Sequence, residues 1–294
     1  MLGWMSWLSL IASGILIIRL LQCRRFMVGL TVMYSWGWAL SASIAVLVSA
    51  LLSGNLIFTS PGWKSASQVA AVVLLLTPAV STLGARKPGV IAWQFFVVLP
   101  LILVLFWPAA SQLISNHGRA ALDLGVPAIT GIVLVLMMSA GTCLGTGMTI
   151  PAIFYLAAVI ICLLPASGWT DSDLWLPLGT PLLLLLAEEI ATRALTKNDL
   201  RSLSNHSISD QVDESWRLFQ DLYGLVWARR VQDRVNLFAS REQWVVILTL
   251  DGFRDALGNP APDQDLEKPR EAFRWVLSRF ADEEWLKARL YRLR

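Results

Sequence analysis

Apolar residues run in seven long segments through the first two-thirds of the chain, and polar residues are concentrated in the last third. A helix needs roughly 20 apolar residues to cross a bilayer, and lipid cannot satisfy free backbone N–H and C=O groups. We therefore expect each segment to be a membrane-spanning helix, in an all-α, polytopic membrane protein with about seven transmembrane helices. The expected spans are residues 4–22, 27–52, 66–84, 89–107, 126–145, 149–166 and 174–194.

The charged residues divide the chain further. Of the 45 Lys, Arg, Asp and Glu residues, 35 lie at or after Glu188. We expect a seven-span domain over residues 1–195, a juxtamembrane linker over 196–209 and a small, mostly helical domain over 210–294. The part from Glu188 onward has 17 basic and 18 acidic side chains, so it gives no electrostatic basis for binding nucleic acid.

Basic clusters predict the orientation, because cytoplasmic loops carry an excess of Lys and Arg. Tryptophans mark the opposite ends of the spans, as expected for side chains that settle at headgroup depth. We expect a plasma membrane location (the inner membrane of a bacterium), with the N-terminus outside and the C-terminus cytoplasmic. The basic clusters are Arg24 and Arg25, Arg86 and Lys87, and Arg193, Lys197 and Arg201; the tryptophans are Trp4, Trp7, Trp63, Trp107, Trp169 and Trp175.

The C-terminal part carries one strong helical pattern. Between residues 213 and 238, apolar side chains repeat at helical spacing, with charged residues on the opposite face. Residues 244–250 fit either a strand or a helix, and residues 252–268 fit a loop. The aromatic side chains of the helical pattern are candidates for binding a partner protein in the cytosol: Trp216, Phe219, Tyr223 and Trp227.

One short string has a pattern associated with catalysis. Residues 188–193, Glu-Glu-Ile-Ala-Thr-Arg, resemble the EExxxR pattern of the CAAX-protease-like intramembrane peptidases. That resemblance implies catalytic roles for Glu188, Glu189 and Arg193. The family also needs histidines on other spans. The two histidines here, His117 and His206, fall in an outer loop and in the linker, so the other half of such a site is missing.

A structural role is the alternative for the same residues. Glu189 and Arg193 can form an ion pair at i,i+4 spacing. Glu188 lies inside the expected hydrocarbon core, where an unpaired carboxylate is costly. We expect Arg19, near the inner end of the first span, to pair with Glu188. The alternative is that the Arg19 side chain extends to the membrane interface.

Glycines and prolines predict how the spans pack. Gly141 and Gly145 form a GxxxG pattern, which favours close packing of the fifth and sixth spans. Pro78, Pro100 and Pro181 each remove a backbone hydrogen bond and can kink their helices. Transporters use such interruptions to build binding sites near the bilayer midplane.

Motifs for cofactors and metals do not occur in this sequence. There is no Walker A sequence, Rossmann fingerprint or H-E-x-x-H, and the three cysteines form no C-x-x-C. No ionisable residue falls near the midplane of an expected span, where ion-coupled carriers usually have them. We therefore expect no cofactor and no metal ion.

A hairpin and a tail segment resemble one known group. Thr77-Pro78, then Leu-Gly-Ala-Arg-Lys-Pro-Gly at 83–89 and Trp93, are similar to the third-to-fourth span hairpin of an uncharacterised bacterial family of multi-pass membrane proteins. Residues 222–227, Leu-Tyr-Gly-Leu-Val-Trp, resemble the same family. The resemblance implies a multi-pass membrane protein and no activity.

Three functions fit these features. The first is a membrane component without enzymatic activity, whose spans anchor a tail that binds a partner protein, and the charge-free spans favour it. The second is a carrier or permease subunit for a neutral or lipidic solute, with a cavity between the third, fourth and seventh spans. The third is a membrane enzyme that acts near the inner leaflet through Glu188 and Glu189.

Overall fold

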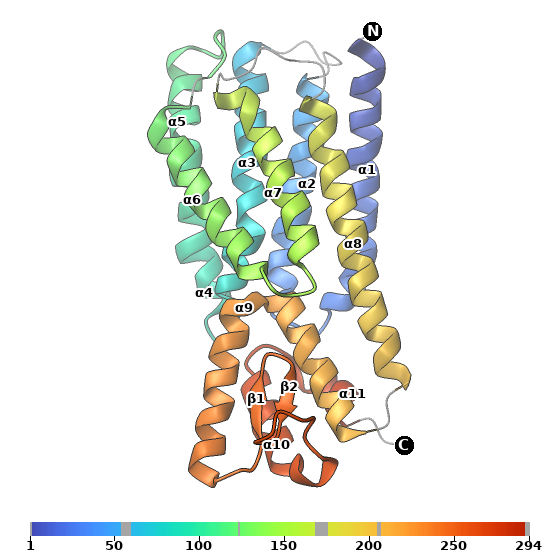
Figure 1. The fold of residues 1–294 in the computed structure, drawn as a ribbon. Coiled ribbons are helices and arrows are strands. Elements are labelled where there is room, and N and C mark those ends of the chain that lie inside the picture. Colours follow the sequence, from blue (N-terminus) through green and yellow to red (C-terminus); the bar gives the residue numbers. More distant parts are fainter. Residues whose placement is uncertain (1, 54–59, 123, 168–175, 205–206, 292–294) are drawn as a thin grey trace.

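The computed structural model describes residues 2–53, 60–122, 124–167, 176–204 and 207–291. The described chain is mostly helical, as its apolar segments predict. Residues 2–204 contribute a bundle of long helices, and a smaller domain begins at residue 207 and packs against one end of the bundle (Figure 1). The N-terminus lies at the far end of the bundle from this C-terminal domain.

The bundle helices follow the expected spans, with shifted ends. Several are long and apolar enough to cross a membrane, namely the stretches Trp4–Met27, Met33–Ser53, Pro61–Leu83, Val90–Ser115 and Val126–Cys143; α7 is shorter and also apolar. These lengths and compositions fit a membrane protein. The elements are α1 (Leu2–Met27), α2 (Met33–Ser53), α3 (Pro61–Leu83), α4 (Val90–Trp93), the π-helical turn η1 (Gln94–Val98), α5 (Leu99–Ser115), α6 (Val126–Cys143), α7 (Thr149–Leu163), the 3₁₀ turn η2 (Leu164–Ser167) and α8 (Leu176–Ser204).

Helix α8 extends into the predicted juxtamembrane linker. It continues without a break through residue 195 to Ser204, so most of the segment 196–209 is helical. Pro181 lies inside α8 and Pro78 inside α3. By contrast, Pro100 stands in the first turn of α5, directly after the π-helical turn. The chain stays helical through this point, since Leu99 still donates to the Gln94 carbonyl, and the change from π-helical to α-helical hydrogen bonding coincides with the proline, which has no N–H to donate.

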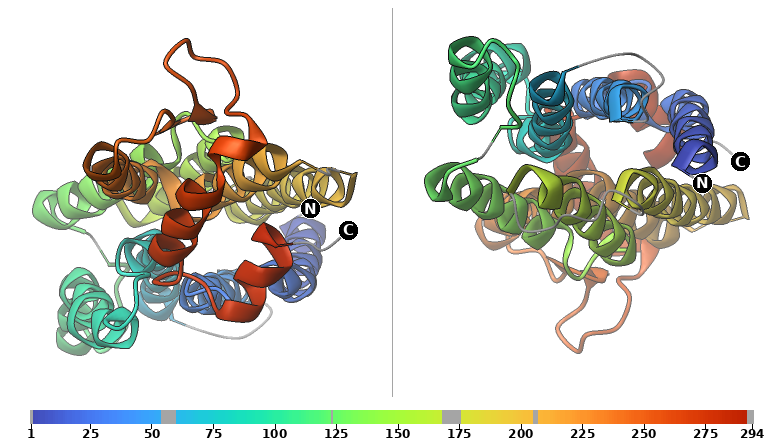
Figure 2. Two further views of the ribbon diagram at one scale, coloured as in Figure 1. Left: turned by 90° about the horizontal axis from the view of Figure 1, so that it is seen from below. Right: turned by 90° about the horizontal axis from the view of Figure 1, so that it is seen from above.

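The bundle helices form two layers when viewed along their axes (Figure 2). One layer contains α1, α2, α3 and α5, and the other contains α6, α7 and α8. Contacts between α1 and α8 join the layers at one side, and contacts of α3 with α6 and α7 join them at the other. The space between the layers is therefore bounded by helices on all sides.

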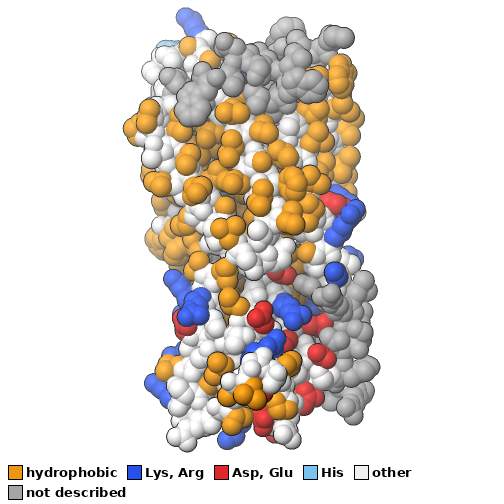
Figure 3. Space-filling model, in the orientation of Figure 1, with side chains coloured by type: hydrophobic (Ala, Val, Ile, Leu, Met, Phe, Trp, Pro, Cys, Tyr) orange, Lys and Arg blue, Asp and Glu red, His pale blue; other side chains and the backbone are white. Residues whose placement is uncertain are grey.

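Hydrophobic side chains are spread over the face of the bundle that Figure 3 shows. Charged side chains gather on the C-terminal domain and on the adjoining end of the bundle. The apolar surface includes highly exposed residues of η1, α5 and α6, such as Phe96, Trp107 and Leu134, which are 80%, 69% and 65% exposed. Such a broad apolar surface is unfavourable in water and suits a lipid environment.

The C-terminal domain is built around α9 (Ile208–Glu242). This helix bends at Gly224 (φ 76°, ψ 174°), and its two halves diverge as an inverted V whose apex meets the bundle (Figure 1). The remaining elements are β1 (Ile247–Thr249), β2 (Gly252–Arg254), η3 (Asp263–Asp265), α10 (Glu267–Leu277) and α11 (Glu283–Leu290).

The strands resolve the ambiguity of residues 244–250 and correct the predicted loop at 252–268. β1 pairs antiparallel with β2, and Leu248 lies opposite Phe253. An isolated two-stranded hairpin is only marginally stable. Side chains of α9 hold this one: Asp213 accepts a hydrogen bond from the Phe253 N–H at 3.0 Å, and Gln232 and Asn236 both donate to the Leu248 carbonyl. The hairpin therefore depends on contacts that are distant in sequence.

Three bundle loops, at residues 28–32, 84–89 and 144–148, hold the C-terminal domain in place. Each forms at least one hydrogen bond with it, and the end of α3 forms another. The donor–acceptor pairs are Thr31 N to Phe280 O (2.8 Å), Lys87 N to Arg279 O (2.8 Å), Gly147 N to Asp221 Oδ1 (2.7 Å) and Trp227 Nε1 to Thr82 O (2.9 Å).

Candidate functional site: a cavity between the two helix layers

A cavity of about 360 Å³ lies between the two layers of the bundle. Side chains from α1, α2, α3, α6, α7 and α8 line it, and most of them are apolar. Its volume falls within the range typical of small-molecule sites, about 300–1,000 Å³. The carrier hypothesis predicts a cavity between the third, fourth and seventh spans, but no described residue of α4, η1 or α5 lines this one. Larger apolar lining residues include Leu16, Trp36, Leu75, Leu136, Leu156 and Leu184.

Pro78 lines the cavity, and its neighbours explain how α3 remains a helix there. Proline has no N–H to donate to the carbonyl of Leu74, one turn earlier. The Thr77 hydroxyl donates to that carbonyl instead, at 2.7 Å. The Thr82 hydroxyl donates to the carbonyl of Pro78 at 2.9 Å. The Thr-Pro pair therefore allows a proline beside the cavity without an unsatisfied backbone group.

Among the described residues that line the cavity, Glu188 is the one with a formally charged side chain. Its side chain is 7% exposed, and three side chains donate hydrogen bonds to it. Arg19 Nε lies 2.9 Å from Oε2, so the structure contains the Arg19–Glu188 pair that the sequence predicts. The Thr192 hydroxyl and the Cys23 thiol donate to Oε1, at 2.7 and 3.1 Å. The carboxylate is thus both paired and hydrogen-bonded, as a buried charge requires.

A second carboxylate shares the same guanidinium. Arg19 also donates to Glu189, whose other oxygen lies 2.6 Å from Arg193 Nε. The i,i+4 pair expected on α8 is therefore present. Together the four side chains form a continuous chain of alternating charge, from Arg193 through Glu189 and Arg19 to Glu188. Only the Glu188 end of this chain lines the cavity within the described residues.

The three residues with an expected catalytic role do not all lie at the cavity. Glu188 lines the cavity, but Glu189 and Arg193 do not, and their side chains are 30% and 78% exposed. His117 follows α5 at the opposite end of the bundle from the C-terminal domain, and His206 lies outside the described residues. Within the described residues, no three His, Cys, Asp or Glu side chains are grouped so that they could hold a metal ion.

Sequence reasoning missed Cys23 and Thr192 as partners of Glu188. Each is four residues after a member of the ion pair, since Cys23 follows Arg19 and Thr192 follows Glu188. Residues four apart lie on the same helical face. This spacing is the signal that could have identified both.

Tyr155 of α7 adds a polar group to the cavity lining. Its hydroxyl oxygen is buried and forms no hydrogen bond with any described residue. Buried hydroxyl groups are normally paired, because an unsatisfied one costs free energy. Tyr155 therefore stands out among the polar side chains of the described bundle.

The GxxxG prediction is wrong in this structure. Helix α6 ends at Cys143, so Gly141 and Gly145 do not lie on one helical face. Gly145 adopts a positive φ of 81° in the turn that follows, and a Cβ at Gly141 would meet nothing within 4 Å. The glycines end a helix and form a turn rather than bring the fifth and sixth spans together.

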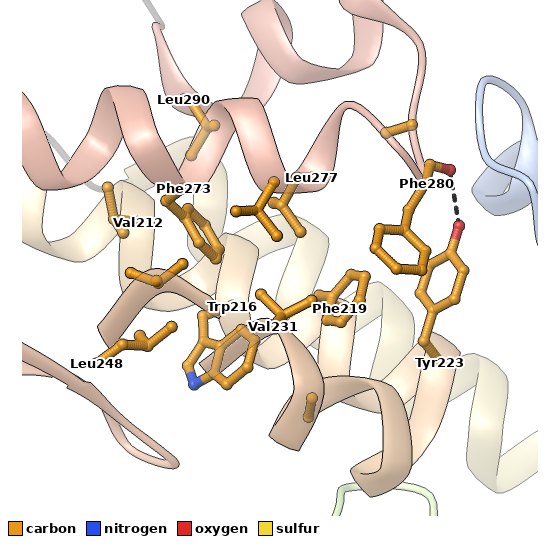
Figure 4. Close-up of a cluster of buried hydrophobic side chains, with 14 of the residues drawn as sticks. Val212, Trp216, Phe219, Tyr223, Val231, Leu248, Phe273, Leu277, Phe280 and Leu290 are labelled. Atoms are coloured by element: carbon orange, nitrogen blue, oxygen red, sulfur yellow. Dashed lines mark hydrogen bonds between the residues drawn. The ribbon is translucent and has the colours of Figure 1, made fainter. Parts of the chain in front are cut away.

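The aromatic residues of α9 cannot form the predicted partner surface, because they are the core of the C-terminal domain (Figure 4). Trp216, Phe219, Tyr223 and Trp227 are between 0% and 6% exposed. Trp216 packs edge-on against Phe273 of α10, with ring centroids 6.0 Å apart. Tyr223 also contacts the bundle, where its hydroxyl lies 3.0 Å from that of Thr31. The apolar face predicted from periodicity is therefore covered by the chain itself.

No protein-family model, curated protein or solved structure matches this chain.

Proposed function

We propose that this chain is a seven-helix integral membrane protein that carries a neutral, lipidic solute in the cavity between its two helix layers. The cavity is the observation that carries this proposal. It is large enough for a small ligand, mainly apolar, and surrounded by helices whose outer surfaces suit lipid. A proline within the continuous helix α3 also lines it.

Several observations support the proposed topology. Helices α7 and α8 lie alongside the five longer apolar stretches (Figure 1). The basic clusters at Arg24, Arg86 and Lys197 all belong to the end of the bundle that carries the C-terminal domain. By the positive-inside rule, we place this domain in the cytosol and the N-terminus outside. The membrane we propose is the plasma membrane, the inner membrane of a bacterium. Exposed tryptophans toward the other end suit the outer interface: Trp4, Trp7, Trp63 and Trp107.

The other two hypotheses have less support. The partner-binding hypothesis rests on the charge-free spans and on an aromatic surface, and the residues of that surface are buried in the core. The enzyme hypothesis requires Glu188 and Glu189 to act together, and only Glu188 lines the cavity within the described residues. The cavity supports the carrier hypothesis, although helices other than the fourth span line it with the third and the seventh.

A flipping assay in proteoliposomes tests the proposal. The protein is reconstituted into vesicles of phosphatidylethanolamine and phosphatidylglycerol that contain an NBD-labelled monohexosyl lipid. Its uncharged sugar headgroup crosses a bare bilayer slowly, because hydroxyl groups are costly in hydrocarbon. Dithionite destroys NBD in the outer leaflet only, so the protein should increase the fraction that is destroyed.

A matched pair of variants connects any movement to the cavity. Ala140 lines the cavity and Leu134, on the same helix, is 65% exposed on its outer surface. Ala140→Trp fills the cavity and should slow the movement severalfold, whereas Leu134→Trp should leave it unchanged. Equal movement in vesicles with and without the protein, or equal effects of the two variants, would overturn the carrier proposal.

A further inference from the structure

The hydrogen bonding of Glu188 leaves room for one more donor. A carboxylate offers about four acceptor positions. Arg19, Thr192 and Cys23 each donate one hydrogen bond to Glu188. One acceptor position therefore remains on a side chain that borders the cavity, and a donor from a molecule in the cavity would complete the set.

The charge of Glu188 is already balanced. Arg193, Glu189, Arg19 and Glu188 form a chain of two cations and two anions. A cationic ligand would add an uncompensated positive charge to an apolar cavity, and an anionic ligand would face the carboxylate. Both are costly in such surroundings. An uncharged donor such as a hydroxyl group meets neither cost.

Apart from the Tyr155 hydroxyl, the rest of the wall suits a hydrocarbon. The Ser43 and Ser139 hydroxyls, which also line the cavity, donate to carbonyls of their own helices at 2.9 and 2.7 Å. On α1 the lining runs from Leu16 to Met27. At 1.5 Å per residue, this corresponds to about 16 Å of helix, shorter than an extended hexadecyl chain, which must therefore bend to lie along this wall.

We propose that the cavity takes a single uncharged amphiphile whose hydroxyl group donates to Glu188 and whose hydrocarbon chain lies along the apolar wall. This assignment rests on the proposed function, because it names the class of solute that the cavity accepts. Arg19 holds the carboxylate in position and neutralises it. The site is therefore selective for a hydroxyl headgroup over an ammonium or a carboxylate.

The cysteines of the chain provide a test that needs no variant. Cys23 and Cys143 line the cavity, whereas Cys162 lies in a separate small pocket. The protein in phosphatidylcholine nanodiscs is alkylated with N-ethylmaleimide, and the rate at each cysteine is measured by mass spectrometry. Hexadecan-1-ol and hexadecyl methyl ether are added at increasing mole fraction, since the ether has a similar chain but cannot donate a hydrogen bond. We expect the alcohol to protect Cys143 from alkylation at a mole fraction at least about fivefold lower than the ether requires. The alkylation rate of Cys162 should not change with either compound.

Substitutions at the ion pair sharpen the test. Glu188→Gln removes the charged acceptor and should reduce the preference for the alcohol over the ether. Arg19→Met leaves the carboxylate unpaired and should shift the preference toward hexadecylammonium. Arg193→Met is the control, because Arg193 does not contact Glu188 directly. This variant should prefer the alcohol over the ether as strongly as the unaltered protein does.

Each outcome has a defined meaning. If the alcohol and the ether protect Cys143 equally, the headgroup assignment is overturned and the carrier proposal stands. If neither protects Cys143 at any mole fraction, the cavity binds no such amphiphile and the carrier proposal loses its basis as well. Preference of the unaltered protein for hexadecylammonium would also overturn the assignment.

Discussion

The indole nitrogen of Trp227 donates a hydrogen bond to the carbonyl oxygen of Thr82 at 2.9 Å. The last carbonyl groups of an α-helix have no partner within the helix. The Thr82 carbonyl also accepts the Ala85 N–H at 3.1 Å in the turn after α3, and Trp227 adds a second hydrogen bond to it from the C-terminal domain. Trp227 is 6% exposed, and its ring packs edge-on against Phe280 with centroids 5.0 Å apart. The two parts of the protein are thus joined by specific packing.

Replacement of Trp227 by Phe should weaken this junction. The change removes the hydrogen bond and part of a buried ring, and we expect a loss of about 1–3 kcal/mol of unfolding free energy. Hydrogen exchange should increase in the last turn of α3 and in α11. The control is Trp275→Phe, because Trp275 is 48% exposed and far less should change. Equal exchange in the two variants would contradict the role of the junction.

Gly224 should tolerate no side chain. It has a φ of +76°, and a Cβ there would lie 2.6 Å from the carbonyl oxygen of Thr142. Gly258 also has a positive φ, of +84°, but a Cβ there would meet nothing within 4 Å. Alanine at Gly258 should cost about 1–2 kcal/mol for the left-handed conformation alone. Alanine at Gly224 should cost clearly more in thermal unfolding, because the apex of α9 must also move away from α6. Similar costs at both positions would refute this explanation.

Removal of Arg19 should destabilise the bundle through Glu188. Arg19→Met leaves a carboxylate that is 7% exposed without its cation. We expect a loss of about 1–3 kcal/mol, reduced by the partial exposure of Arg19 itself. The double variant with Glu188→Gln should recover part of that loss. Arg193→Met should cost less than about 0.5 kcal/mol, because Arg193 is 78% exposed. Additive effects of the Arg19 and Glu188 substitutions in thermal unfolding would contradict the coupling.

High pH should destabilise the C-terminal domain through Tyr223. Burial raises the pKa of the Tyr223 phenol, and hydrogen bonds with Thr31 oppose the shift only in part. The folded protein therefore holds this proton more tightly than the unfolded chain, in which tyrosine titrates near about 10. Stability from the protonated phenol is complete below that pH and is lost as the pH rises above it. Unfolding free energy should thus decline more steeply above about pH 10 in the unaltered protein than in Tyr223→Phe. Equal slopes in denaturant titrations would refute this.

Tyr155→Phe should stabilise the protein. The hydroxyl of Tyr155 is buried without a partner among the described residues, so its removal relieves a desolvation cost of about 1 kcal/mol. Thermal unfolding in detergent should move to a higher temperature. A clear loss of stability would mean that the hydroxyl forms a hydrogen bond in solution, for example with a buried water molecule.

Much of the helical fold could be predicted from the sequence, because the length and apolar composition of a segment determine whether it can cross a membrane as a helix. The Arg19–Glu188 pair could be predicted for a similar reason, since a buried carboxylate needs a cation. The second contact of Arg19, with Glu189, could not be predicted, because it depends on the orientation of long side chains. The helix ends differ from the expected ones at both ends of the bundle, as at Met27 of α1 and Ser115 of α5.

Periodicity reveals that a helical face is covered but not what covers it. The apolar face that contains Trp216 and Trp227 was correctly placed on a helix, yet it packs within the chain. The strand pair at Leu248 and Phe253 escaped prediction because side chains of α9 hold it in place. The cavity could not be predicted either. It is a space left by the packing of six helices, and no local pattern encodes it.

The loops that hold the C-terminal domain come from both helix layers. Those at 28–32 and 84–89 connect helices of the first layer, and the loop at 144–148 joins α6 to α7 in the second. Val32, Thr82 and Met148, which lie in or beside these loops, also line the cavity. The C-terminal domain therefore contacts both helix layers and links them at this end of the bundle. Separation of the layers at that end would break the hydrogen bond that the Gly147 N–H donates to Asp221, so this end of the bundle is held together from outside its own helices.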